Sequence, residues 1–269
     1  MIRSDQSWRS MLKPNLESMF CIIPALMFGE PSCHPLTRYE SFYEAFAKPV
    51  EKGPEAFICY SDVPDPLFNV IMRLSCVDVR EKVDSILEKA PRNQPISFWL
   101  HPQNHAPGLK PILQEKGFSP LIRCPLFTWT VKEIEVMEGD IRRADMFVFH
   151  EIVGRVYSFT EEVKTAFEKL MEKIECENYL IYEQGIPIGT ATLLVKGSVG
   201  GIFNDATLPG QREASKALTE FLMCRAFELR LDELVLLSSP EGEELYADLG
   251  FNKVFDIEIY GRPHGLDWR

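Results

Sequence analysis

The chain has 269 residues, and its composition of 45% apolar and 26% charged residues is that of a globular protein with ample material for a core. Because this length exceeds the usual size of one domain, two domains are expected. The formal net charge of −11 and the lack of a dense Lys/Arg run argue against a nucleic-acid partner, since a phosphate backbone would be repelled.

The first apolar segment of the chain spans residues 19–29. It is too short to cross a bilayer, and Pro24 interrupts it. Glu17 lies just before it and no small-residue cleavage site follows, so it lacks the pattern of a signal peptide. We therefore expect a buried helix here and no association with a membrane.

The remainder of the first half contains one helix pattern and two strand patterns. Apolar residues at helical spacing predict a helix over residues 79–87. Apolar runs predict strands over residues 96–100 and 126–131.

The cysteines and histidines argue against disulfides and against a metal site. The seven cysteines are odd in number and form no C-x-x-C pair, which is typical of reduced thiols in a cytoplasmic protein. His101 and His105 have an i, i+4 spacing, but Pro102 lies between them and no acidic or cysteine ligand completes a set. We expect a cytoplasmic location and no metal ion.

From residue 139 onward, helix and strand patterns follow one another regularly. Asp145 and Thr160 are predicted to cap two helices, because a side-chain oxygen at this position accepts a hydrogen bond from the first turn. Gly185 and Gly197 mark turns, so the three strands around them should form an antiparallel meander. The elements expected after the two helices are strands over 179–182, 188–195 and 199–206, a helix over 214–229, a strand over 234–237, a helix over 241–249 and a strand over 255–260.

The two halves of the chain resemble each other. The segment DPLFN at residues 65–69 resembles GGIFN at 200–204, and LQEKGF resembles YADLGF at a nearly equal offset. Two matches in the same order favour a duplication. Asn69 and Asn204 fall at the same place in this match, which favours a structural role, such as a bulge or a turn bond, over catalysis.

Three segments of the second half carry a resemblance to a known family: EQGIPIG at 183–189, NDATLP at 204–209 and SPEGEELYADLGF at 239–251. Through them the second half resembles the GNAT superfamily of N-acetyltransferases over nearly all of residues 139–261. The last contains the L-Y-x-x-x-G-F pattern of the family, with Ser239 where an Asn is usual.

The resemblance implies an α/β fold of the mixed α+β class, built from two GNAT-like halves that each have a mixed central sheet flanked by helices. Residues 1–135 would be a diverged half and residues 136–269 the acetyltransferase domain, with the acidic segment 132–140 as their junction. Leu113 stands in the first half where Tyr246 stands in the second, so the first half is expected to be non-catalytic and to shape the acceptor site.

The resemblance also implies acetyl-CoA as the co-substrate, lying where the fourth and fifth strands of the sheet splay apart. Tyr246 would be the general acid for the departing thiolate, because a phenol of pKa ~10 is a slightly weaker acid than a thiol of ~8.5. Asp205 is a candidate base for the incoming ammonium. The residues expected to bind the cofactor are Asp205, Ala206, Thr207, Gly210, Gln211, Arg212, Ala214, Ser215 and Ser239.

The loop that should receive the pyrophosphate departs from the family pattern. Family members usually carry R-G-x-G-x-G/A between Leu-Pro and Ala-Leu, whereas this chain has the shorter GQREASK. Glu213 brings a negative charge toward the phosphates, while Arg212 and Lys216 could compensate for it. Two interpretations stay open: a shortened loop that still binds phosphate at the helix N-terminus, or a relic that is only a turn.

Two functions are therefore open. The first is an acetyl-CoA-dependent N-acetyltransferase in which a small-molecule or peptide amine attacks the thioester directly, since no Cys or Ser lies in a nucleophile motif. The second is a catalytically degenerate GNAT-like module that binds a ligand or a partner protein. The sequence leaves the acceptor and the oligomeric state open.

Overall fold

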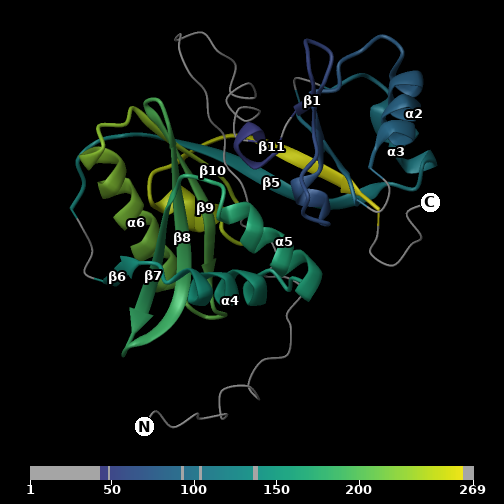
Figure 1. Cartoon of the computed structure of the whole chain (residues 1–269). Helices are drawn as coiled ribbons and strands as arrows, with labels where there is room; N and C mark the ends of the chain where they lie inside the picture. Colours follow the sequence, from purple (N-terminus) through teal and green to yellow (C-terminus); the bar gives the residue numbers. More distant parts are fainter. Residues whose placement is uncertain (1–42, 48, 92–93, 103–104, 136–138, 263–269) are drawn as a thin grey trace.

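A computed structural model describes residues 43–47, 49–91, 94–102, 105–135 and 139–262 of the chain (Figure 1). The apolar segment 19–29 lies outside these residues, so the buried helix expected there stays a prediction. The strands are β1 (Pro49–Lys52), β2 (Phe57–Cys59), β3 (Val70–Met72), β4 (Ser97–Leu100), β5 (Ser119–Thr130), β6 (Asp140–Arg143), β7 (Glu177–Glu183), β8 (Ile186–Lys196), β9 (Val199–Thr207), β10 (Glu233–Leu237) and β11 (Asn252–Gly261). The helices are α2 (Val79–Lys89), α3 (Leu109–Glu115), α4 (Met146–Val156), α5 (Glu161–Met171), α6 (Arg212–Glu228) and α7 (Glu243–Asp248).

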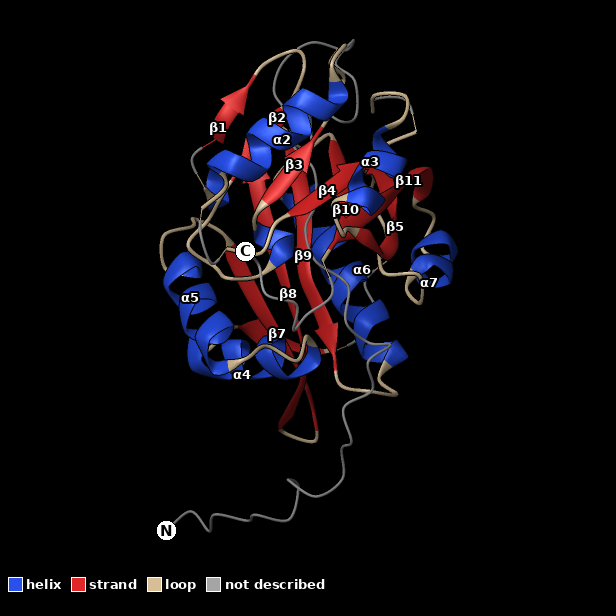
Figure 2. Cartoon of the chain, turned by 90° about the vertical axis from the view of Figure 1, so that its right-hand side faces the viewer, coloured by secondary structure: helices blue, strands red, loops and turns tan. Residues whose placement is uncertain are grey.

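The described residues form an 11-stranded mixed sheet in the order β1-β2-β3-β4-β11-β5-β10-β9-β8-β7-β6. Helices cover both faces of it: α4 and α5 lie on one side of β7, β8 and β9, and α6 lies on the other (Figure 2). This architecture confirms the predicted mixed α+β class.

Each half ends in a strand that lies beside strands of the other half (Figure 1, teal and yellow). β5 from the first half pairs antiparallel with β10, where Trp129 lies opposite Leu234. β11 from the second half pairs antiparallel with β4, where Ile259 lies opposite Trp99. β5 and β11 also pair with each other over most of their lengths. The exchange joins the two halves into one continuous sheet, and β5 extends beyond the predicted strand because β11 pairs along it.

The order of the elements is the same in the two halves. β3, α2, β4, α3 and β5 follow one another in the first half, as β9, α6, β10, α7 and β11 do in the second. In both halves the strands before and after the long helix are parallel neighbours. A duplication would produce this repeat, and the boundary near residue 135 stays a prediction.

The match between Asn69 and Asn204 is wrong in its alignment. Asn69 comes just before Val70, the first residue of the β3–β4 pair, whereas Asn204 lies beyond Gly201, the last residue of β9 that pairs with β10. The two segments therefore occupy different places relative to the parallel pair. The structural role of Asn69 is nevertheless confirmed, since its side chain accepts from the Ser61 amide at 2.8 Å and donates to two backbone carbonyls.

The local signals for the helices of the second half are confirmed. Asp145 caps α4 by accepting a hydrogen bond from the Val148 amide, and Thr160 caps α5 by accepting one from the Val163 amide. The strands β7, β8 and β9 form the expected antiparallel meander.

Several sequence expectations concern ions and membranes. Within the described ranges, no group of three or more His, Cys, Asp or Glu side chains could hold a metal ion. No helix in the described part of the chain is both long enough and apolar enough to cross a bilayer.

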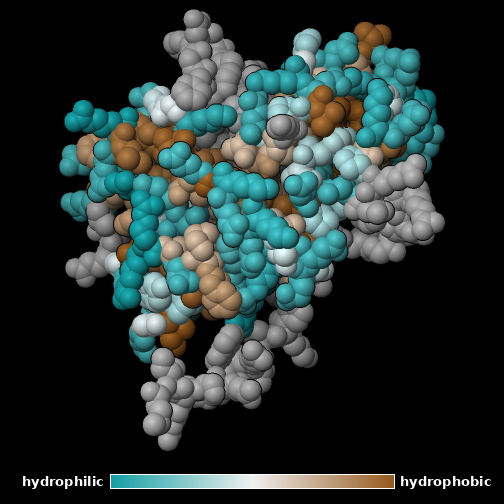
Figure 3. Space-filling model, viewed as in Figure 1, coloured by the Kyte–Doolittle hydropathy of each residue, from teal (hydrophilic) through white to brown (hydrophobic). Residues whose placement is uncertain are grey.

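The described cysteines are all free: Cys59, Cys76, Cys124, Cys176 and Cys224. The surface seen in Figure 3 is mostly hydrophilic, with hydrophobic residues in small groups.

Candidate active site

The parallel strands β9 and β10 are paired at one end and separate toward the other. Their register runs from Val199 opposite Glu233 to Gly201 opposite Val235 and then ends, while β9 continues to Thr207. A Cβ on Gly200 would lie 2.6 Å from Leu234 Cδ2, so a larger residue here would require the Leu234 side chain to shift. Because the pairing ends at Gly201, the carboxyl end of β9 is separated from β10, as the splayed sheet of the resemblance implies.

β9 carries a bulge in its separated part. The pairing with β8 shifts register between Thr190 and Thr192, and Asn204 has a φ of 46°. Thr190 Oγ1 donates to the Asn204 carbonyl at 2.8 Å, and Asn204 Nδ2 donates to Thr192 Oγ1 at 3.1 Å. A bulge interrupts the ladder and bends the strand, so Asn204 has the structural role predicted for it and sets the direction of Asp205.

Asp205 and Tyr246, the two candidate catalytic residues, are in direct contact. The Tyr246 hydroxyl donates to Asp205 Oδ2 at 2.9 Å. Thr219 donates to the same oxygen at 2.8 Å, and Ser215 donates to Oδ1 at 3.1 Å. One carboxylate therefore connects β9, α6 and α7. Sequence reasoning missed Thr219, although its i, i+4 spacing from Ser215 on the predicted helix was a signal that could have found it.

Burial determines the acidity of Asp205. Desolvation raises the pKa of its carboxyl group to about 6, against the three hydrogen bonds, which lower it. At neutral pH the group is mostly ionised, yet it is a stronger base than an exposed aspartate. Functional acids and bases often combine burial with a specific partner in this way.

The Tyr246 ring is held within the core beneath its hydroxyl. Tyr246 is 2% exposed, and its ring centroid lies 6.0 Å from that of Phe127 and 5.8 Å from that of Phe251. Phe127 comes from β5, so the exchanged strand of the first half helps to fix Tyr246. The L-Y-x-x-x-G-F pattern accordingly corresponds to one packed unit, in which Phe251 supports the tyrosine.

The start of α6 presents its backbone rather than a capping side chain. Gln211 is the N-cap and makes no side-chain capping bond, and Gly210 before it has a φ of 84°, which favours glycine. The amides of Ala214 and Ser215 donate to the Gln211 carbonyl, so they belong to the helix ladder. The cofactor-binding role of Ala214 and Ser215 stays a prediction.

The other predicted cofactor residues differ in exposure. Ala206 is buried on the bulged strand, and Thr207 is half-buried at its end. The Ser239 hydroxyl accepts from the Gly242 amide at 3.2 Å, which fixes the turn that leads into α7.

Arg212 is engaged by the carboxylates of α7. Its guanidinium lies 2.8 Å from Glu244 Oε2 and 3.3 Å from Asp248 Oδ2. Lys216 Nζ lies 4.0 Å from Glu220 Oε1. The two cations that could compensate for Glu213 therefore already face acidic groups.

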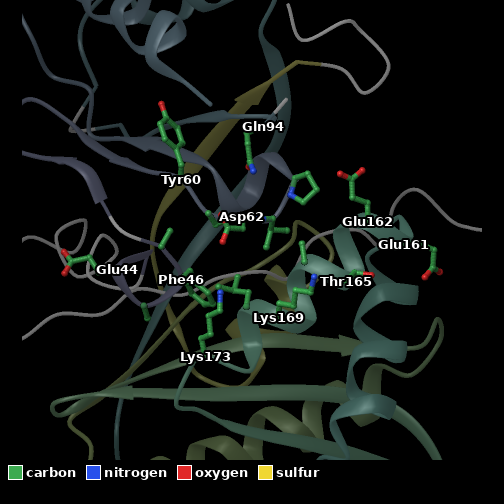
Figure 4. Close-up of a pocket in the computed structure, with 17 residues that line it drawn as sticks. Glu44, Phe46, Tyr60, Asp62, Gln94, Glu161, Glu162, Thr165, Lys169 and Lys173 are labelled. Carbon is green, nitrogen blue, oxygen red and sulfur yellow. Dashed lines mark hydrogen bonds between the residues drawn. The ribbon is translucent and has the colours of Figure 1, made fainter. Parts of the chain in front are cut away.

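A cavity of about 1230 Å³ lies between the two halves (Figure 4). One wall comes from residues 44–47, 60–64 and Gln94 of the first half, and the other comes from α5 and the turn after it. Phe46 of the first wall contacts Phe203 of β9, with ring centroids 5.4 Å apart. This cavity is formed by both halves and carries no continuous sequence signal.

No family model matches the sequence, and no curated protein sequence matches it. Solved structures do match the fold. A GCN5-related N-acetyltransferase from Kribbella flavida superposes with a TM-score of 0.61 at 19% identity, over 83% of this chain and 92% of that chain. A GCN5-related N-acetyltransferase from Sphaerobacter thermophilus gives a TM-score of 0.56 at 13% identity, over 87% and 88%. A functionally unknown conserved protein from Staphylococcus epidermidis gives a TM-score of 0.63 at 10% identity, over 80% of this chain and 94% of that chain. The chain therefore has the GNAT fold.

Proposed function

We propose that the chain is an N-acetyltransferase that uses acetyl-CoA and acetylates a small-molecule or peptide amine. The observation that carries the proposal is the 2.9 Å hydrogen bond from Tyr246 to Asp205, where β9 and β10 separate. A tyrosine proton donor and a carboxylate of raised pKa, in contact at the opened end of a sheet, suit acyl transfer from a thioester to an amine.

The backbone around β9 and α6 fits acetyl-CoA. The bulged segment Asp205–Ala206 would hold the acyl and pantetheine end. The exposed Gly210, the N-cap Gln211 without a side-chain cap and the first turn of α6 would hold the pyrophosphate. When bound, the cofactor supplies an acetyl group activated as a thioester.

The paired side chains account for the proton balance of the reaction. The amine loses one proton as its C–N bond forms, and the sulfur gains one as the C–S bond breaks. The Asp205 carboxylate accepts the first proton, and the Tyr246 hydroxyl donates the second. Because the hydroxyl already donates to Asp205, the proton taken by the carboxylate can return to the tyrosine and restore both groups.

If Asp205 is the base, kcat/KM should depend on pH with the pKa of Asp205. We expect kcat/KM to fall as the pH drops through about 6, because protonation removes the base. Ser215→Ala removes a hydrogen bond that lowers this pKa, so the limb should move to higher pH. Thiol release from acetyl-CoA with a panel of primary amines measures both profiles. A limb near pH ~4, the value of an ordinary aspartate, would exclude Asp205 as the base.

We propose that the first half, residues 1–135, is non-catalytic. Leu113 of α3 takes the place in the first half that Tyr246 of α7 takes in the second, and it is buried and has no hydroxyl. The role of the first half in this proposal is to supply β5 to the second half and one wall of the cavity.

A second candidate, a binding module without catalysis, is favoured by the ion pairs of Arg212. Glu244→Gln and Asp248→Asn each remove one of the two carboxylates that hold its guanidinium, and with it a negative charge near the start of α6. If this turn receives pyrophosphate, each change should tighten acetyl-CoA binding about two- to fivefold in calorimetry.

Glu183→Gln is the control for this measurement, because it removes the same charge from the exposed end of β7. It should leave the affinity unchanged. Absence of acetyl-CoA binding by the wild type and by both variants would favour the binding module.

A further inference from the structure

We infer that the cavity between the two halves binds an amine that carries a carboxylate or phosphate group, through Lys169 and Lys173. The inference rests on the proposed function, in which such a molecule would be the acceptor.

The two lysines lie together on one wall of the cavity. Lys169 is in the last turn of α5, and Lys173 is in the turn that follows it. Figure 4 shows their nitrogen atoms directed into the space between the two walls. A volume of about 1230 Å³ exceeds what a single small ion requires, so the cavity accommodates an organic molecule.

Lys169 and Lys173 lack the carboxylate partners that neighbouring lysines have. Lys164 of the same helix is paired with Glu151, and Lys52 is paired with Glu44 of the cavity wall. Among the residues that the structure describes, no carboxylate lies within 4.0 Å of Lys169 or Lys173. Their charges are therefore available to an anionic group of a ligand.

The acidic residues of the cavity stand apart from the lysines. Glu161 and Glu162 occupy the first turn of α5, where the helix dipole favours negative charge, and Figure 4 shows them at the far end of the helix. Asp62 is exposed on the opposite wall and makes no ion pair within the described ranges. A carboxylate facing two ammonium groups suits a ligand with charges of both signs, as an amine bearing an anionic group has.

One residue of the cavity wall contacts the strand that carries the proposed site. Phe46 lines the cavity and contacts Phe203, the residue before the bulge at Asn204. A ligand held between the lysines and Phe46 therefore lies on the face of β9 opposite α6. This places the amine-binding cavity on one face of the opened sheet and the start of α6 on the other.

Two fluorescent probes that differ by a single anionic group test the inference. Anilinonaphthalene sulfonate should bind the wild type more tightly than phenylnaphthylamine, its uncharged parent. Lys169→Gln and Lys173→Gln should each weaken binding of the sulfonate about two- to fivefold and leave the parent unchanged. The effect should shrink as salt is raised.

Lys164→Gln is the matched control, because it removes the same charge from the same helix outside the cavity. It should leave both affinities unchanged. Equal affinity of the two probes for the wild type would overturn the inference. An equal loss of sulfonate affinity in Lys164→Gln would overturn it too, because the effect would then come from the charge of the helix and not from the cavity.

Competition with small amines identifies the group that is recognised. Phosphoethanolamine or aminobutyrate should displace the sulfonate probe, and the better of the two distinguishes a phosphate from a carboxylate. Displacement by ethanolamine, which has no anionic group, to the same extent would overturn the inference. Neither assay contains acetyl-CoA, so their failure is distinguishable from failure of the proposed acetyl transfer.

Discussion

Tyr246→Phe should lower kcat by about 10²- to 10⁴-fold, with little change in the affinity for acetyl-CoA. The hydroxyl is needed when the thiolate leaves, whereas the ring packing against Phe127 and Phe251 is retained in the variant. The measurement is thiol release with the most active amine of a panel, together with calorimetry of acetyl-CoA binding.

Thr219→Val is the matched control for this experiment. It removes another hydroxyl that donates to Asp205 Oδ2, but not the proposed proton donor. Its effect on kcat should be smaller than that of Tyr246→Phe, because the lost hydrogen bond to the carboxylate raises the pKa of Asp205 but supplies no proton to the thiolate. An equal loss in both variants would show that Tyr246 acts only by positioning Asp205, and an unchanged kcat in Tyr246→Phe removes the tyrosine from the mechanism.

Trp129→Ala should destabilise the whole protein by about 3–5 kcal/mol, because it leaves a large cavity in a packed core. Trp129 is 2% exposed on β5, yet it packs in the core beneath α6 with Phe251 and residues of the second half. The melting temperature should fall by about 6–20 °C. Urea unfolding followed by far-ultraviolet circular dichroism measures the free energy of unfolding.

The shared core also predicts how the variant unfolds. Since β5 and β11 join the two halves, Trp129→Ala should still unfold in one transition, at a lower urea concentration. Ile186→Ala at the exposed start of β8 is the control and should change the free energy of unfolding by less than about 0.5 kcal/mol. Two separate transitions, with only the first-half transition shifted, would contradict a common core.

Local signals in the sequence predicted the local structure of this chain. Asp145 and Thr160 cap helices because a side-chain oxygen needs only the three residues that follow it. Alternating or continuous apolar runs predicted β7 to β10, because strand burial follows from the faces of a few neighbouring residues. The tyrosine and the Gly-Phe pair of the terminal motif predicted the fold, since these residues pack on one another within a few positions.

The tertiary structure decided which residues far apart in the sequence meet in the site. Asp205 and Tyr246 could each be named from the sequence, but their contact depends on a bulge in β9 and on the packing of α7. The ion pairs of Arg212 with Glu244 and Asp248 could not be predicted. These residues are 32 and 36 positions away in the sequence, and no sequence spacing indicates a contact at such separations.

The sequence also could not predict the strand partners of β5 and β11. Each strand has an apolar pattern that predicts a strand, but the pattern is satisfied equally by a partner from either half. The choice of partner is made by the packing of both halves together, which places Trp129 beneath α6 and forms the cavity between residues 60–64 and α5. The sequence by itself determined which segments are helices and strands and which motif the second half carries, because these depend on neighbours along the chain. The tertiary structure decided the pairing, the ion pairs and the cavity, because these depend on neighbours in space.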